Sequence, residues 1–178
     1  MGSEMCIRDS YYSYQMIHKL AQSIAEQVMN SGFSPDIIVA IGTGGFIPAR
    51  ILRTYLGKPI LALGIAYYDL NDKPMDYPRK VQWIEEAEKQ LAGKRILLVD
   101  EVDDSRLTLE YCTKELLAYR PAALAVSVLH NKQKEKRGAF PPGVQYVFVG
   151  ENLGDDWIVY PWDARDIDEH DKNAALEH

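Results

Sequence analysis

Two short, continuously apolar segments constrain the fold of this chain most strongly. Ile37–Ile41 is apolar and mostly β-branched throughout, and Arg95–Val99 is apolar after its first residue. Continuous rather than alternating hydrophobicity is typical of a strand that is buried on both faces, as in a parallel sheet. Parallel neighbours need long crossover connections, which are usually helices. The two segments therefore predict an α/β fold.

The remaining segments alternate between helical and strand patterns. Apolar residues from Ile17 to Val28 fall on one helical face, and Pro121 ends a later helical segment. We expect helices over Tyr14–Asn30, from Ile47 onward, over Lys80–Leu91 and over Thr108–Tyr119, and further strands over Ile60–Ala66, Leu124–Leu129 and Tyr146–Val149. This alternation predicts a mainly parallel twisted sheet with helices on both faces.

Length and composition exclude several other classes of protein. The 178 residues suffice for one domain with a substantial core, and a formal net charge of −6 argues against sequence-independent binding of nucleic acid. Cys6 and Cys112 lie far apart, so we expect neither a disulfide framework nor a zinc site. No apolar run approaches the roughly 18–20 residues that a membrane span requires. We therefore expect a soluble, cytoplasmic protein without a nucleic-acid or membrane partner.

Both ends of the chain lack the patterns of the rest. Met1–Ser3 resembles a leader added by cloning, and Leu176–His178 resembles the start of a purification tag. Glu4–Ser10 shows no periodicity. We expect a single domain over residues 11–173, with residues 1–10 and 174–178 as added or disordered ends.

One polar segment interrupts the alternation of helices and strands. Tyr67–Arg79 contains three aspartates and two prolines and has little periodicity. A loop of this length in a compact domain is often a lid or a binding loop. A disordered surface insert is the alternative, and the two interpretations stay open at this point.

Three unusual segments each follow a predicted strand directly. They are the glycine-rich Gly42–Gly45, the acidic Asp100–Thr108 and the short polar segment His130–Lys132. In open parallel sheets, ligands bind beyond the carboxyl ends of the strands. We therefore expect the three segments to meet in one binding site.

Each of the first two segments also has a purely structural explanation. Gly42–Gly45 lacks the glycine spacing of a dinucleotide fold and the lysine of a P-loop, so it is either an anion site made of backbone N–H groups or a tight turn. Asp100–Asp104 carries four carboxylates, whose repulsion a divalent cation, ligand hydroxyls or helix amides could offset. A solvated turn with Asp104 or Ser105 as helix cap is the alternative.

Four segments together resemble a known family. Asp36–Arg53, Val99–Leu109, Val128–Lys132 and Trp157–Ala164 are similar, in this order, to segments of the type I phosphoribosyltransferases, and most similar to the fungal type of hypoxanthine-guanine enzymes. The resemblance implies a type I phosphoribosyltransferase fold with a small C-terminal hood that binds the base. It also implies transfer of ribose 5-phosphate from phosphoribosyl pyrophosphate (PRPP) to N9 of a 6-oxopurine, which gives a purine nucleotide and pyrophosphate.

The resemblance assigns residues to PRPP and to a metal ion. Asp100 and Glu101 would accept hydrogen bonds from the ribose hydroxyls, and the loop before Thr108 would bind the 5′-phosphate. The residues assigned to PRPP in this way are Thr43, Gly44, Gly45, Asp100, Glu101, Asp103, Ser105, Arg106, Leu107 and Thr108. Mg²⁺, the implied cofactor, would lie near Asp100, Glu101 and Asp163. A cis peptide bond between Gly42 and Thr43 is also implied.

The resemblance assigns the base site to the last two segments. Trp157 would stack on the purine, the backbone of Ile158 would contact its edge, and Lys132 would donate to the oxygen at C6. Asp104 is the implied catalytic residue and would face N7. Taken alone, Trp157 is explained as a core residue, Lys132 as a surface lysine and Asp163 as a helix cap.

Two points limit what the resemblance implies. Arg106 stands where the family commonly has glycine, and Tyr67–Arg79 is shorter and differently composed than in many members. Two alternatives to a hypoxanthine-guanine enzyme also stay open: a xanthine-preferring enzyme, and a regulator that senses PRPP and binds nucleic acid. We rank hypoxanthine and guanine before xanthine, because no side chain over Trp157–Asp163 offers an evident donor to an oxygen at C2. We also expect a homodimer.

Overall fold

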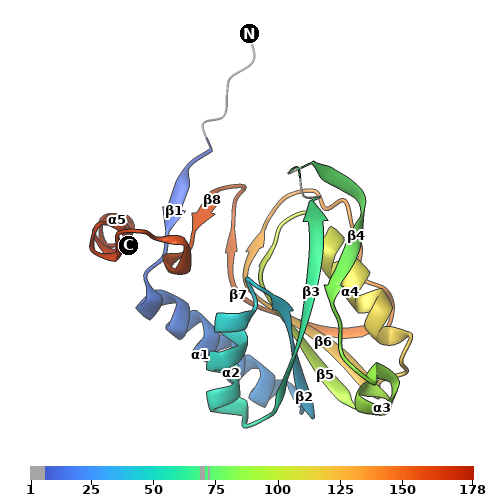
Figure 1. The fold of residues 1–178 in the computed structure, drawn as a ribbon. Coiled ribbons are helices and arrows are strands. Elements are labelled where there is room, and N and C mark those ends of the chain that lie inside the picture. The colour runs from blue at the N-terminus through green and yellow to red at the C-terminus, as the bar shows by residue number, and fades with distance from the viewer. Residues whose placement is uncertain (1–6, 69–70, 72) are drawn as a thin grey trace.

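The computed structural model describes residues 7–68, 71 and 73–178 (Figure 1). Along the chain the elements are β1 (Asp9–Tyr11), α1 (Tyr14–Ser31), β2 (Ile37–Gly42), α2 (Phe46–Leu56), β3 (Ile60–Tyr68), β4 (Pro74–Gln82), α3 (Ala87–Leu91), β5 (Arg95–Asp103), α4 (Leu107–Leu117), β6 (Ala123–Lys132), β7 (Val144–Leu153), β8 (Trp157–Val159), the 3₁₀ helix η1 (Pro161–Asp163) and α5 (Ile167–Glu177). The predicted α/β class is confirmed.

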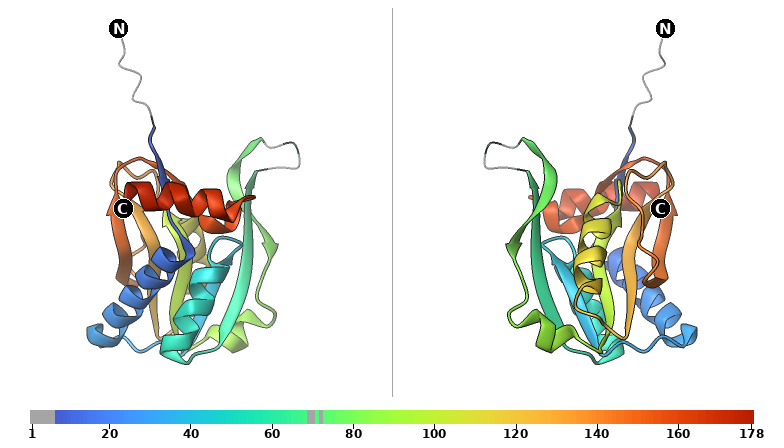
Figure 2. Two further views of the ribbon diagram at one scale, coloured as in Figure 1. Left: turned by 90° about the vertical axis from the view of Figure 1, so that its left-hand side faces the viewer. Right: turned by 90° about the vertical axis from the view of Figure 1, so that its right-hand side faces the viewer.

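A six-stranded sheet in the order β4-β3-β2-β5-β6-β7 forms the centre of the molecule. The strand pairs from β3 to β7 are parallel, and β4 is antiparallel to β3. Figure 2 shows α1 and α2 on one side of this sheet and α4 on the other. The predicted parallel sheet with helices on both faces is therefore confirmed.

The two continuously apolar segments are buried on both faces, as predicted. In β2, Ile38 and Ala40 pack into the core under α1 and α2, whereas Val39 and Ile41 pack into the core under α4. Successive side chains of a strand point to opposite faces, so a strand inside two cores must be apolar at every position.

A small unit at the carboxyl ends of the strands, which we call the hood, consists of β1, β8, η1 and α5. β1 pairs in parallel with β8, with Ser10 opposite Ile158. The Tyr11 amide donates to Glu177 Oε2 at 2.9 Å, and His170 Nε2 lies 2.7 Å from the Tyr12 carbonyl oxygen. Ordered elements thus extend beyond residues 11–173 at both ends, to Asp9 and to Glu177. The assignment of one domain to residues 11–173 stays a prediction.

The helix predicted over Lys80–Leu91 is wrong in its first half. β4 extends to Gln82 and pairs with β3, with Arg79 opposite Ala66, so only Ala87–Leu91 is helical. Trp83, Ile84, Ala87 and Leu91 have helical spacing, which is why the sequence favoured a longer helix. Pairing with β3 determines the structure of the residues up to Gln82 more strongly than this local pattern does. The two prolines of β4 are tolerated since it is an edge strand.

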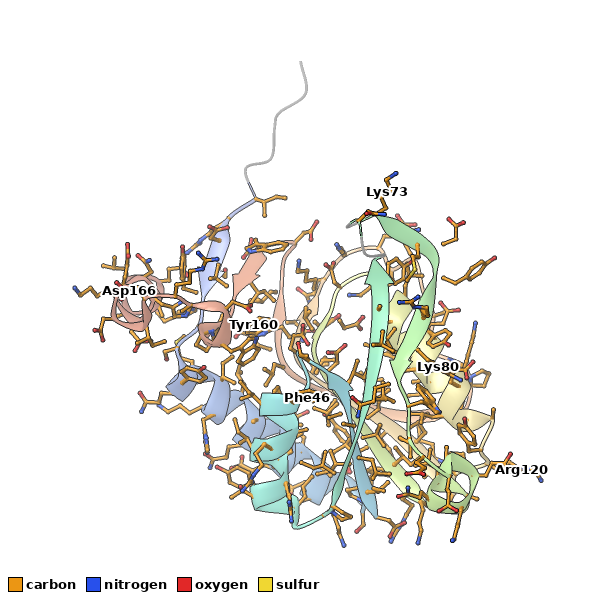
Figure 3. The ribbon with its side chains drawn as sticks, viewed as in Figure 1. Phe46, Lys73, Lys80, Arg120, Tyr160 and Asp166 are labelled. Carbon is orange, nitrogen blue, oxygen red and sulfur yellow. The ribbon has the colours of Figure 1, made fainter. Side chains whose placement is uncertain are left out.

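Tyr67–Arg79 therefore belongs mostly to a β3–β4 hairpin and not to an irregular loop. Its residues 69, 70 and 72 lie outside the described part of the chain. Lys80 on β4, labelled in Figure 3, forms an ion pair of 2.5 Å with Glu115 on α4. Trp83 Nε1 donates to the Tyr119 hydroxyl at 3.0 Å. These contacts fix the base of the hairpin against α4.

Candidate active site

The three segments singled out in the sequence meet at the carboxyl ends of β2, β5 and β6. Two adjoining cavities lie there. One is lined by Asp100, Glu101, Val102, Asp104, Ser105, Arg106, Thr108 and Leu109. The other is lined by Glu101, Val102, Asp104, Lys132, Trp157, Ile158, Tyr160 and Asp163. Glu101, Val102 and Asp104 line both, so a ligand that fills the two cavities has these residues at its centre.

The glycine loop is packed closely against β5. The Gly42–Thr43 peptide bond is cis, as the resemblance implies, and the Gly45 amide donates to the Ile41 carbonyl at 2.8 Å. A Cβ atom on Gly45 would meet the carbonyl oxygens of Val99 and Ile41, and one on Gly44 would collide with the Glu101 carboxylate. Close approach of backbone atoms requires glycine at Gly45, whereas a side chain at Gly44 would displace the Glu101 carboxylate from its present position. Thr43 stays exposed at the mouth of the loop.

Arg106 has a backbone conformation that favours glycine, the residue that is common at this position in the family. Its φ is +70°, and its guanidinium donates to Asp103 Oδ2 at 2.8 and 3.0 Å. The guanidinium also lies 4.4 Å from the centre of the Phe140 ring. Asp103 is 1% exposed, so this ion pair lies beneath the loop and stabilises its turn. Arg106 also lines the first cavity, and the assignment of Asp103 and Arg106 to PRPP stays a prediction.

The start of α4 forms the wall of the first cavity. α4 begins at Leu107, and the Leu107 amide lies 3.4 Å from Ser105 Oγ. The Ser105 carbonyl accepts from the amides of Arg137 and Gly138, both at 3.1 Å. Ser105 and Thr108 thus line the cavity at the N-terminus of an eleven-residue helix. The first backbone amides of a helix have no partner within the helix, so this arrangement is suited to binding a phosphate.

Asp100 and Glu101 lie side by side at the end of β5. The Glu101 amide donates to Asp100 Oδ1 at 2.9 Å. Burial and the neighbouring Glu101 carboxylate raise the pKa of Asp100 well above its usual range. A cation or ligand hydroxyls would offset this cost. No cluster of three or more potential metal ligands occurs among the described residues. The pair fits Mg²⁺ in its usual setting, where one or two carboxylates are joined by water and substrate oxygens.

The second cavity has an aromatic wall and a buried lysine. Trp157 is 62% exposed, so it is not a core residue, whereas Ile158 is buried in β8. Lys132 is 7% exposed, so it is not a surface lysine, and its Nζ lies 5.9 Å from the centre of the Trp157 ring. Asp163 is exposed at the end of η1 and lines the same cavity. The structure brings the predicted base-site residues together.

Asp104 lies between the two cavities beside two lysines. Lys132 Nζ donates to Asp104 Oδ2 at 3.4 Å, and Lys134 forms an ion pair with Oδ1. Both lysines also face Asp155, at 3.8 and 3.2 Å. Burial opposes ionisation of Asp104, but the hydrogen bonds and charges of Lys134 and Lys132 outweigh it and lower the pKa of Asp104. Asp104 is therefore ionised near neutral pH and able to accept a proton.

Sequence reasoning missed a buried network that connects the hood to this site. The Tyr160 hydroxyl donates to the Glu101 carbonyl at 3.2 Å, and His130 Nδ1 lies 2.8 Å from the same hydroxyl. Figure 3 shows Tyr160 where the hood meets the carboxyl ends of the sheet. Its place directly after β8, inside the segment that resembles the base site, is the signal that could have found it.

We expect His130 to make the protein less stable in acid. Burial lowers the pKa of His130 to about 4, below the ordinary value of about 6.5. Between these values the unfolded chain binds a proton that the folded chain does not, so the free energy of unfolding falls as pH decreases from 6.5 to 4, by up to about 3 kcal/mol. Urea unfolding at pH 7, 5.5 and 4.5 measures this.

A His130→Gln variant provides the comparison for that experiment. It keeps a polar side chain near the Tyr160 hydroxyl but does not titrate in this range. We expect the difference in unfolding free energy between wild type and variant to shrink as pH falls. An equal loss of stability in both proteins would contradict the assignment to His130.

Comparison with known protein families agrees with the fold and the two cavities. Residues 8–166 match the family model of the phosphoribosyl transferase domain. The chain belongs to the phosphoribosyltransferase family. Within the described residues, none of the helices has the length and apolar character needed to cross a membrane.

The chain is similar to several individual proteins over almost its whole length. The chain is similar to the hypoxanthine-guanine phosphoribosyltransferase of Schizosaccharomyces pombe, at 42% identity over 93% of this chain and 94% of that enzyme. It is also similar to xanthine phosphoribosyltransferase 1 of Saccharomyces cerevisiae, at 37% identity over 94% and 95%. A solved structure of a Neisseria gonorrhoeae protein with bound ppGpp has a TM-score of 0.90 and 45% identity, covering 98% of this chain and all of that one.

Proposed function

We propose that this protein transfers the 5-phosphoribosyl group of PRPP to N9 of a 6-oxopurine and releases pyrophosphate. The observation that carries the proposal is the pair of adjoining cavities with Glu101 and Asp104 in both walls. One cavity has the acidic and hydroxyl groups that a sugar phosphate requires, and the other has an aromatic face and a buried lysine. Their common wall is the place for the bond between sugar and base.

In this proposal the first cavity binds PRPP. Asp100 and Glu101 accept hydrogen bonds from the ribose hydroxyls. Ser105, Thr108 and the amides at the start of α4 bind the 5′-phosphate. Thr43 and the Gly44 amide bind the pyrophosphate, and Gly45, whose amide is bonded to the Ile41 carbonyl, lets the loop pack closely against β5. The Asp103–Arg106 ion pair supports the turn from below.

Magnesium is the proposed cofactor. Asp100, Glu101 and Asp163 would hold it, together with oxygens of PRPP and water. When bound, Mg²⁺ supplies positive charge that stabilises the leaving pyrophosphate. The carboxylates of Asp100 and Glu101 stabilise the positive charge that develops on the ribose ring.

The second cavity binds the base. Trp157 stacks on the purine, the Ile158 backbone contacts its edge, and Lys132 donates to the oxygen at C6. Lys132 faces Asp104 in this structure, so binding of the base replaces one acceptor of the lysine by another. Asp104 then faces N7 and accepts or returns a proton as N9 attacks the sugar.

The choice of base tests this proposal. We expect hypoxanthine and guanine to be the best substrates, xanthine to be poorer and adenine to be the poorest of the four, because Lys132 can donate to an oxygen at C6 but has no acceptor there in adenine. Measuring kcat/KM for the four bases at saturating PRPP gives the order. A preference for xanthine would indicate a xanthine phosphoribosyltransferase instead, and a preference for adenine would refute the role of Lys132.

A second candidate function is binding of ppGpp, which the gonococcal relative contains. A guanine nucleotide with diphosphates on the ribose has the chemistry to occupy both cavities at once. We expect ppGpp to raise the KM for PRPP without lowering kcat. Inhibition that saturating PRPP does not relieve would contradict a shared site.

Other predictions made from the sequence stay predictions. They concern a cytoplasmic location, a homodimer and the absence of nucleic-acid and membrane partners. The regulator that binds nucleic acid is the less favoured alternative, because the second cavity contains every residue assigned to base binding. Tight, salt-dependent binding of a specific DNA or RNA would support it.

A further inference from the structure

Lys136 makes an unusual set of contacts beneath the site. Its Nζ donates to three main-chain carbonyl oxygens: those of Asp103 at 2.7 Å, Asp104 at 2.9 Å and Lys132 at 2.7 Å. The side chain is 12% exposed. An ammonium group has three N–H donors, and here each of them has an acceptor. Lys136 is therefore a largely buried bridge and not part of a solvated basic surface.

The bridge begins where the β5–β6 ladder ends. The last paired residues of these strands are Asp103 and Asn131. Asp104 and Lys132 come directly after them, so no ladder hydrogen bond fixes their separation. Lys136 binds the carbonyl oxygens of both residues and connects the two strand ends through one atom.

The charge of Lys136 is compensated from below. Asp103 Oδ1 lies 3.7 Å from Nζ, and Asp103 is itself paired with Arg106. Burying an ammonium is costly unless hydrogen bonds and an opposite charge offset the loss of water. The arrangement supplies both: burial lowers the pKa of Lys136, and the neighbouring Asp103 carboxylate opposes this effect. Hydrogen bonds donated by an ammonium group are stronger than those between neutral groups.

We infer that Lys136 is a positioning residue that fixes Asp104 relative to Lys132 and thereby sets selectivity for 6-oxopurines. The inference rests on the proposed function, in which Asp104 faces N7 and Lys132 faces the oxygen at C6. N7 and the oxygen at C6 lie on the same edge of a purine, so a bound base gives each of the two side chains a partner of its own, and their direct ion pair no longer fixes their separation. The contacts of Lys136 are to the backbone, so they persist when the base binds.

The test is a comparison of wild type with Lys136→Met, which keeps the length of the side chain and removes the charge and donors. A displacement of about 1 Å in a reacting group can cost about a hundredfold in rate. We expect kcat/KM for hypoxanthine to fall about tenfold to a hundredfold. We also expect the preference for hypoxanthine over adenine to fall, while the KM for PRPP changes by less than about threefold.

Restoring the ammonium separates positioning from general loss of structure. A Lys136→Cys variant treated with 2-bromoethylamine forms a thioether and releases bromide, which places an ammonium group at nearly the same distance from the backbone. We expect this treatment to restore most of the lost kcat/KM. Cys112 is buried, and wild type treated in the same way controls for other alkylation. Lys114→Met, which removes an exposed ion pair with Glu110, should leave the kinetics unchanged.

The outcomes are distinguishable. Normal kinetics and base preference in Lys136→Met would overturn the inference alone. An equal loss of PRPP and purine binding that alkylation does not reverse would also overturn it, since that result indicates general damage to the fold. Absence of turnover in the wild type with any purine would refute the proposed function, and the inference with it.

Discussion

An Asp104→Asn variant is expected to lose about 10²- to 10⁴-fold in kcat, with smaller changes in the KM values of both substrates. The substitution keeps the size and one hydrogen-bond acceptor but removes the charge that can take up a proton. In the wild type, Lys132 and Lys134 lower the pKa of this carboxyl, so the group is ionised and positioned between the two cavities. Single-turnover and steady-state kinetics with hypoxanthine measure the effect.

Asp155→Asn is the matched comparison for Asp104. Asp155 faces the same two lysines, but it lies on the exposed segment before β8 and lines neither cavity. We expect its substitution to alter the KM for the base and to spare kcat. Equal losses of kcat in the two variants would show that the lysines, and not the proton acceptor, account for the effect of Asp104.

A Gly45→Ala variant is expected to lose about 3 kcal/mol of stability. The new methyl group would meet the carbonyl oxygens of Val99 and Ile41, which belong to two central paired strands and cannot move as a side chain can. If the protein still folds, the glycine loop must shift away from β5, and binding of PRPP should weaken as well. Urea unfolding and titration with PRPP measure the two effects.

Gly154→Ala serves as the control for that experiment. A Cβ atom at Gly154 meets no atom within 4 Å, and its backbone is not in the left-handed region. We expect the unfolding free energy of this variant to stay within about 0.5 kcal/mol of wild type. Equal stability of the Gly45→Ala and Gly154→Ala variants would contradict the close packing of the glycine loop.

The central strands were predictable because their burial on two faces leaves a direct trace in the sequence. Ile37–Ile41 and Ile96–Val99 are apolar at every position, and such a pattern is typical of a strand that is buried on both faces. The meeting of the three segments followed from the same reasoning, since parallel strands bring their carboxyl ends to one edge. Fold class and the place of the site thus depend on local patterns, which one sequence contains.

Other features depend on contacts between distant segments, which local patterns do not contain. Pro74–Gln82 is a strand only because β3 pairs with it, and Asp9–Tyr11 is a strand only because β8 lies beside it. Lys136 looks like one member of a basic cluster in the sequence. Its role depends on three carbonyl oxygens that two strand ends bring together.

Arg106 shows how the structure can resolve a departure from a family pattern. A residue with a side chain at φ +70° is unfavourable, which makes glycine the common choice. Here the ion pair with Asp103 and the contact with Phe140 compensate for the conformation. The residue types at these three positions could be noted in the sequence, but their contact could not.

Product analysis of one reaction tests the central claim most directly. Purified protein is mixed with PRPP, hypoxanthine and Mg²⁺, and both nucleotide and pyrophosphate are quantified, with guanine in a parallel reaction. The proposal predicts that nucleotide and pyrophosphate form in equal amounts and that chelation of Mg²⁺ stops both. Hydrolysis of PRPP without nucleotide formation, or no turnover of either base, would contradict it.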